Sequence, residues 1–93
     1  MQITVQYTGQ LAGITGKADE TVEIPEGTRL GALVGRLCKT HGAEYSDLLV
    51  DRAGDLRPST MVIFDGEQIL GDYAEIEISG VKTVMLMTPI AGG

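Results

Sequence analysis

The sequence is poor in the residues on which many protein chemistries depend. It contains one cysteine, Cys38, and one histidine, His41. A single cysteine excludes an internal disulfide and a metal cage built from cysteines. With one histidine, expected at a helix end, no Ser/His/Asp set can be assembled. The chain therefore offers no active site of its own that the sequence can identify.

Basic residues and long apolar runs are also scarce. Seven Lys and Arg are scattered among 13 Asp and Glu, which gives a net charge of -6. Phosphate-binding surfaces normally need clustered Lys and Arg, so nucleic acid is not an expected partner. No run approaches the roughly 18 apolar residues of a membrane span, and the first residues lack the regions of a secretory signal. We expect a cytoplasmic protein with no membrane partner, steered by its acidic surface toward basic protein surfaces.

Nucleotide and metal motifs are absent as well. Gly16-Lys17 resembles the end of a P-loop, but Leu11 stands where that pattern needs glycine and Ala18 where it needs Ser or Thr. The aspartates do not follow the spacing of a calcium loop. The sequence predicts no metal site and no cofactor bound by this chain.

What the chain does contain is enough apolar residues for one core. It has 93 residues, of which 43% are hydrophobic, and this suits a single domain. Residues 2–8 alternate strictly, with Ile3, Val5 and Tyr7 on one face, as in a half-buried strand. Residues 21–24 alternate again, so the two segments are expected to form a hairpin. Residues 9–16 hold three glycines and are predicted to be a loop.

A helix is predicted after Thr28, which can serve as its N-cap. Gly42 is expected to end the helix. Cys38 lies on the apolar stripe and is expected in the core rather than as a nucleophile. His41, in the last turn, is expected at the surface or as a cap. The apolar residues that follow helical spacing are Leu30, Leu33, Val34, Leu37 and Cys38.

The second half of the chain reads mainly as strands. Residues 44–59 are mixed and polar, with a short apolar patch at 48–50. Residues 61–64 are predicted to be a strand, Asp65-Gly66 a tight turn, and residues 68–70 a short returning strand. Residues 72–78 leave strand and turn open. Residues 82–88 form the last predicted strand, which Pro89 ends.

This order favours an α+β fold in which one main helix packs on one face of a mixed sheet. The last predicted strand has apolar residues on both faces, and one helix covers only one of them. We expect Met85 and Met87 on the open face, beside Thr4, Gln6 and Thr8, unless residues 9–18 or 44–59 fold over it. The residues predicted to meet beneath the helix are Ile3, Val5, Leu30, Leu33, Val34, Leu37, Val62 and Val84.

The residues after this strand have a composition suited to a flexible tail. We expect a domain over residues 1–88 and a tail over residues 89–93, which reads Pro89, Ile90, Ala91, Gly92 and Gly93. A carboxylate on Gly-Gly has no side chain nearby and can thread a narrow channel to a nucleotide's α-phosphate. The alternative is that two terminal glycines arise by chance.

Taken together, the chain resembles the MoaD/ThiS family of ubiquitin-like sulfur carriers. The resemblance rests on the strand from Ile3 to Tyr7, the segment Val22-Glu23-Ile24-Pro25-Glu26-Gly27-Thr28, the segment Met61-Val62-Ile63-Phe64-Asp65-Gly66 and the end Pro89-Ile90-Ala91-Gly92-Gly93. Ser79-Gly80-Val81 replaces a frequent Asp-Gly-Asp turn, and Thr88-Pro89 replaces a frequent Pro-Pro pair, which leaves the subfamily open. The resemblance implies a ubiquitin-like β-grasp fold.

The resemblance also implies a function. An E1-like enzyme, which holds ATP and Mg²⁺, would convert the Gly93 carboxylate to an acyl adenylate. Sulfur transfer would leave a thiocarboxylate that donates sulfur to an accepting biosynthetic enzyme. The chain would then be a co-substrate rather than an enzyme, with Met85, Met87 and Thr8 in the partner-binding surface. The open alternatives are a protein modifier conjugated through Gly93 to lysines, the small subunit of molybdopterin synthase, and a β-grasp interaction module.

Overall fold

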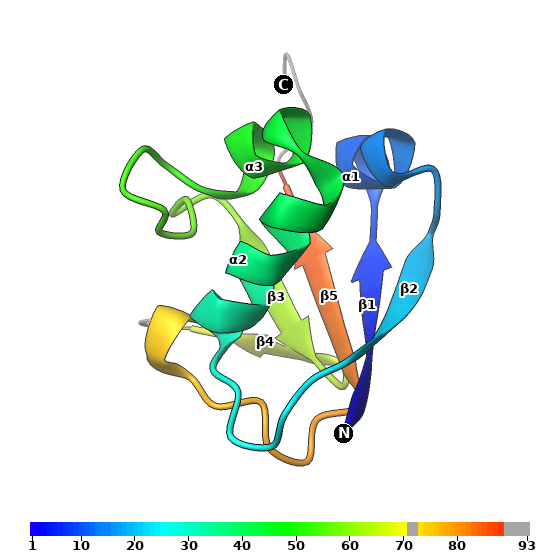
Figure 1. Cartoon of the computed structure of the whole chain (residues 1–93), viewed down its shortest axis with the longest axis vertical. Coiled ribbons are helices and arrows are strands. Elements are labelled where there is room, and N and C mark those ends of the chain that lie inside the picture. Colours follow the sequence, from blue (N-terminus) through cyan, green and yellow to red (C-terminus); the bar gives the residue numbers. More distant parts are fainter. Residues whose placement is uncertain (71–72, 89–93) are drawn as a thin grey trace.

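The chain folds into a mixed sheet with helices packed against it (Figure 1). The computed structural model describes residues 1–70 and 73–88. The strands are β1 (Gln2–Tyr7), β2 (Asp19–Glu23), β3 (Met61–Phe64), β4 (Glu67–Ile69) and β5 (Thr83–Met87). The helices are α1 (Gly9–Thr15), α2 (Leu30–His41), α3 (Ala43–Leu49) and the 3-10 turn η1 (Tyr73–Glu75).

The sheet has the strand order β2-β1-β5-β3-β4, so β5 is its central strand. β1 and β2 form the predicted antiparallel hairpin. β5 runs parallel to β1 and antiparallel to β3. The predicted α+β class with a mixed sheet is confirmed, and the main helix α2 crosses one face of this sheet (Figure 1).

The core lies between this sheet face and the helices. The alternation of β1, β3 and β5 turns every second side chain inward, and the apolar stripe of α2 covers them. Leu11 of α1 and Leu49 of α3 join the same cluster, so the three helices pack on one side of the sheet. The eight predicted core residues are all buried in this cluster: Ile3, Val5, Leu30, Leu33, Val34, Leu37, Val62 and Val84.

Residues 9–16 were predicted to be a loop, but they form helix α1 (Gly9–Thr15) and its C-cap, Gly16. Its glycines made a helix improbable from propensity alone. Leu11, fully buried, and Ile14, packed against the core, stabilise it through one face. Gly16 ends it in the left-handed region with φ 74°, and its N–H donates to the Ala12 carbonyl at 2.9 Å.

Residues 43–49 form helix α3, whereas the sequence predicted only a mixed polar stretch over residues 44–59. Tyr45 and Leu49 are fully buried and Leu48 packs against the core. These residues are spaced i, i+3 and i+4, which is the spacing of one helical face.

The start of α2 differs from the prediction, because Thr28 is not its N-cap. Its N-cap is Arg29 with no capping side chain, whereas the Thr28 hydroxyl donates to the Pro25 carbonyl at 2.6 Å. A backbone bridge to the segment after η1 replaces the cap: Leu30 N–H donates to the Ile76 carbonyl at 2.8 Å. The other end of α2 agrees with the prediction, because Gly42 follows it with φ 92°.

The tight turn at Asp65-Gly66 is confirmed and holds the start of β5. Both residues have positive φ, 48° and 89°, as a two-residue hairpin turn requires. The Asp65 carboxylate accepts hydrogen bonds from the backbone N–H groups of Lys82 and Thr83, at 3.0 and 2.8 Å. Strand and turn were both open for residues 72–78. The described part, residues 73–78, contains the turn η1 and a bridge between Glu77 and Arg29.

Candidate functional site at the carboxyl end of the central strand

The predicted tail follows directly from the central strand. β5 ends at Met87 and Thr88 is the last residue described before residue 89. The tail residues Pro89, Ile90, Ala91, Gly92 and Gly93, and hence the boundary between domain and tail, lie outside the described residues. Because β5 is paired on both sides, the chain reaches residue 88 from a firmly held strand.

The face of β3 and β5 away from the helices carries an apolar patch of four residues, which we call the methionine patch: Met61, Ile63, Met85 and Met87. The register places Met61 opposite Met87 and Ile63 opposite Met85. Met61 is 38% exposed and the other three are half-buried. The predicted orientation of β5 is confirmed, since Val84 and Leu86 are completely buried on the helix side.

Polar residues of β1 border the methionine patch. Gln6 is in register with Met85, and Thr4 with Thr83. Thr8, predicted in the same surface, lies one residue beyond the last registered pair and forms the N-cap of α1. Its side chain is half-buried and makes no capping hydrogen bond. The structure therefore brings Thr8, Met85 and Met87 to the same end of the sheet, and their role in binding stays a prediction.

A hydrogen-bonded polar cluster on the helix side was missed from the sequence. Glu20 Oε2 accepts from the Tyr7 hydroxyl at 2.6 Å and from His41 Nε2 at 2.5 Å. The Tyr45 hydroxyl donates to the Tyr7 hydroxyl at 3.0 Å. The rings of Tyr7 and Tyr45 meet edge to face, 5.7 Å between centroids. The cluster thus joins β1, β2, α2 and α3.

The position of His41 corrects the expectation of a surface or capping role. Its side chain is only 11% exposed, as is that of Glu20. Burial alone would raise the pKa of Glu20, but hydrogen bonds from Tyr7 and His41 lower it overall. Burial raises the pKa of Tyr7, and the bond to Glu20 raises it further. Burial likewise raises the pKa of Tyr45, so both hydroxyls stay protonated. The cluster therefore has a structural role, because it links two strands and two helices.

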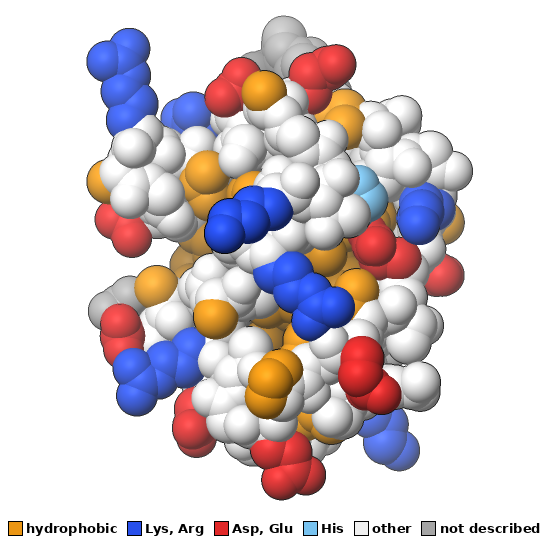
Figure 2. Space-filling model, viewed as in Figure 1, with side chains coloured by type: hydrophobic (Ala, Val, Ile, Leu, Met, Phe, Trp, Pro, Cys, Tyr) orange, Lys and Arg blue, Asp and Glu red, His pale blue; other side chains and the backbone are white. Residues whose placement is uncertain are grey.

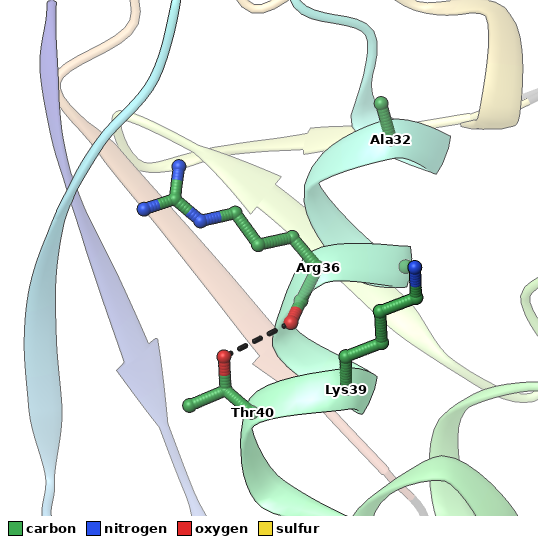
Figure 3. Close-up of a pocket in the computed structure, with 5 residues that line it drawn as sticks. Ala32, Arg36, Lys39 and Thr40 are labelled. Atoms are coloured by element: carbon green, nitrogen blue, oxygen red, sulfur yellow. Dashed lines mark hydrogen bonds between the residues drawn. The ribbon is translucent and has the colours of Figure 1, made fainter.

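A hollow of about 520 Å³ lies on the outer face of α2, and Figure 3 shows the side chains around it. The Arg36 guanidinium reaches across to β2, where it donates to the Glu23 carbonyl. The Thr40 hydroxyl donates to the Arg36 carbonyl at 3.1 Å. The hollow is lined by Ala32, Gly35, Arg36, Lys39 and Thr40, none of which is a carboxylate or thiol.

Within residues 1–70 and 73–88, no group of three or more His, Cys, Asp or Glu side chains could hold a metal ion. Cys38 packs against the core, as predicted, although it is only half-buried. None of the described helices is long and apolar enough to span a membrane.

A five-stranded mixed sheet with its helices on one face and a central last strand defines a ubiquitin-like β-grasp protein. The ThiS family profile matches residues 5–93, and the chain belongs to this family. The resemblance to MoaD/ThiS proteins is thereby confirmed at the level of the family. Comparison with curated proteins finds no match.

Several solved structures share the fold. SAMP1 from Haloferax volcanii is 22% identical with a TM-score of 0.78, and the match covers 100% of both chains. Urm1 from Trypanosoma brucei is 28% identical with a TM-score of 0.75, over 99% of this chain and 95% of that one. A putative molybdopterin converting factor subunit 1 from Pyrococcus furiosus is 21% identical with a TM-score of 0.66, over 97% and 99%.

Proposed function

We propose that this protein is a ubiquitin-like sulfur carrier that works through the carboxylate of Gly93. The observation that carries this proposal is the family match, which extends to residue 93 and so includes Gly92-Gly93. The structure supports it by leading the central strand β5 directly to residue 88, immediately before the predicted tail.

The proposed chemistry takes place on partner enzymes. The Gly93 carboxylate attacks the α-phosphate of ATP on an E1-like enzyme, which forms an acyl adenylate and releases pyrophosphate. The terminal sulfur of a partner persulfide then displaces AMP. A partner thiol cleaves the resulting sulfur–sulfur bond, which leaves a thiocarboxylate on Gly93. That sulfur passes to an accepting biosynthetic enzyme, so the chain is a co-substrate and ATP and Mg²⁺ are held by the partner.

The chain's own contribution is binding and presentation. The methionine patch lies on the open face and includes Met85 and Met87 at the end of the strand that precedes the tail. Flexible thioethers adapt to a partner surface, so we assign this patch to the E1-like enzyme. Thr8 would lie at the edge of that contact, because it follows β1 beside the end of β5.

The direct test is to delete Gly93 and to measure ATP–pyrophosphate exchange with the E1-like enzymes of the source organism. Exchange should require the intact protein and should be abolished by the deletion. The intact mass of the native protein should also show one oxygen replaced by sulfur. Full exchange by the shortened protein would contradict the proposal.

A protein modifier is the second candidate. Structures of small archaeal modifier protein 1 from Haloferax volcanii and Methanosarcina acetivorans share this fold, and an acyl adenylate can equally pass to a lysine amine. The two functions differ in the form of Gly93 in cells. A modifier would be found amide-linked to lysines of other proteins, whereas a carrier would be found as a free thiocarboxylate.

A further inference from the structure

An open groove of about 500 Å³ lies between α1 and α3, and none of the functional assignments above uses it. Its apolar part is formed by Ile14 of α1 and Leu48 of α3, both half-buried against the core. Gly13 leaves one wall open, because a Cβ placed there would meet nothing within 4 Å. The lining residues are Gln10, Gly13, Ile14, Glu44, Asp47 and Leu48.

One rim of the groove is acidic. Glu44 and Asp47 are exposed and stand one helical turn apart on α3. Among the described residues neither carboxylate makes an ion pair within 4.0 Å. Arg57 is nearby, but its guanidinium donates to the Asp47 backbone carbonyl at 2.9 Å. Figure 2 shows acidic side chains beside hydrophobic ones at the end of the molecule where α3 lies.

Helices α1 and α3, whose residues line the groove, lie at the end of the molecule where β5 ends (Figure 1). The register explains this placement: Tyr7 is paired with Leu86, and α1 begins two residues after Tyr7. An enzyme that receives residues 89–93 must therefore approach the end of the fold at which the groove opens.

We propose that this groove is a second docking site for the E1-like enzyme and takes a Lys or Arg side chain from it; this inference rests on the proposed function. The aliphatic stem of such a side chain would lie on Ile14 and Leu48, while its charged head would pair with Glu44 and Asp47. Long basic side chains combine an apolar stem with a charged head in this way. An Arg head can also bind a carboxylate through two parallel hydrogen bonds.

Because both carboxylates are on an exposed rim, their main effect is on the rate of encounter. Charges at an interface rim steer association and make it dependent on salt. The groove should therefore influence the concentration of carrier needed for activation, and leave the adenylation step itself unchanged.

The experiment compares ATP–pyrophosphate exchange by the native protein, two groove variants and a control variant. Each is tested with the E1-like enzymes of the source organism, produced one by one. The first variant, Glu44→Lys with Asp47→Lys, reverses the rim charge. The second, Gly13→Met, fills the groove with a good helix former. Both should raise the KM for the carrier about tenfold or more with kcat unchanged, and the charge variant should also weaken the salt dependence.

The matched control is Glu26→Lys with Glu67→Lys, which makes the same change in net charge far from the groove. Glu26 precedes the start of α2, and Glu67 is paired with Phe64 near the start of β5. The control should change KM much less than the rim variant, and thermal unfolding should show that all forms are folded. If the rim variant and Gly13→Met keep the KM of the control while the native protein is activated, the groove inference fails and the proposed function stands. If none of the enzymes activates the native protein, both fail.

Discussion

At the scale of single residues, Glu20 shows how one side chain can join several elements. Its carboxylate is bound by Tyr7 and by His41 through the same oxygen. The sequence is sufficient to predict which way Glu20 points, because the period of two places it on the same face of β2 as Val22, toward the core. That a carboxylate can point inward depends on its partners, and their positions are set by tertiary packing.

The pKa of Glu20 leads to a prediction about acid stability. The folded protein lowers this pKa, so the charged carboxylate contributes stability fully above the ordinary glutamate value of about 4.3. The contribution is lost as the pH falls through the lower folded pKa. Glu20→Gln should destabilise the protein by about 1–3 kcal/mol at neutral pH, as measured by urea unfolding.

The loss caused by Glu20→Gln should shrink as the pH is lowered below that window, because the native carboxylate is then protonated too. Glu44→Gln is a suitable control, since Glu44 is exposed and makes no ion pair within the described residues. An equal loss of stability at neutral and acidic pH would show that the charge of Glu20 does not stabilise the polar cluster.

Met87 is the second residue on which a prediction rests. Its side chain is half-buried on the open face, opposite Met61. Met87→Asp should weaken binding to the E1-like enzyme strongly, because the complex would bury an unpaired charge. The isolated protein should keep its fold, which circular dichroism and thermal melting can check.

The control for Met87→Asp is Gln2→Asp, which adds the same charge to the same face at the other end of β1, opposite Glu23 and away from the methionine patch. It should bind nearly as well as the native protein. Unfolding of the Met87→Asp protein would instead show that Met87 belongs to the core.

At the scale of elements, the two glycines within α2 differ in how closely the rest of the fold approaches them. A Cβ on Gly31 would lie 3.1 Å from the Ala74 carbonyl oxygen and 3.2 Å from the Ala74 Cβ. This close approach is what allows η1 to pack against α2. A Cβ on Gly35 would meet nothing within 4 Å, so a side chain fits there without a clash.

Alanine substitutions should separate the two glycines. Gly35→Ala should stabilise the protein by about 1 kcal/mol through helix propensity alone. Gly31→Ala should give a smaller gain or a loss, because its methyl group collides with Ala74. The free energies of unfolding from urea titrations measure the difference, and equal gains for both variants would contradict the close approach of η1.

The predictability of the elements follows the strength of their local pattern. The strands and α2 were predicted because period two and period 3.6 are clear in residues 2–8, 30–38 and 61–64. Helix α1 was missed because the helix-breaking tendency of Gly9, Gly13 and Gly16 outweighs the few apolar residues of the segment. The N-cap of α2 was wrongly assigned to Thr28 because the true partner of Leu30 N–H is the Ile76 carbonyl, 46 residues away in the sequence.

The residues of the candidate site also differ in how far the local sequence pattern predicts their positions. Met85 and Met87 were placed on the correct face because alternation is a local property. The methionine patch as a whole was not predicted, because Met61 and Ile63 join it only through the register of β3 with β5. The α1–α3 groove could not be predicted, since neither helix was.

At the scale of the whole molecule, the described residues form one continuous core. The buried cluster of the described residues includes residues from Ile3 to Leu86. The protein lacking Gly93 should therefore melt at nearly the same temperature as the native protein while losing activation. A large drop in melting temperature would assign Gly93 a structural role.

The parallel pairing of β1 with β5 has a mechanical consequence. Among the described residues these are the first and last strands, and they lie side by side pointing the same way. A force that pulls the two ends of the chain apart would slide one strand along the other and load all of their hydrogen bonds together. The β3–β4 hairpin, pulled at its open end, would give way one pair at a time. A partner that pulls on residues 89–93 would load the β1–β5 hydrogen bonds in this shearing direction. We therefore expect β5 to stay in the sheet when a partner binds and pulls the predicted tail.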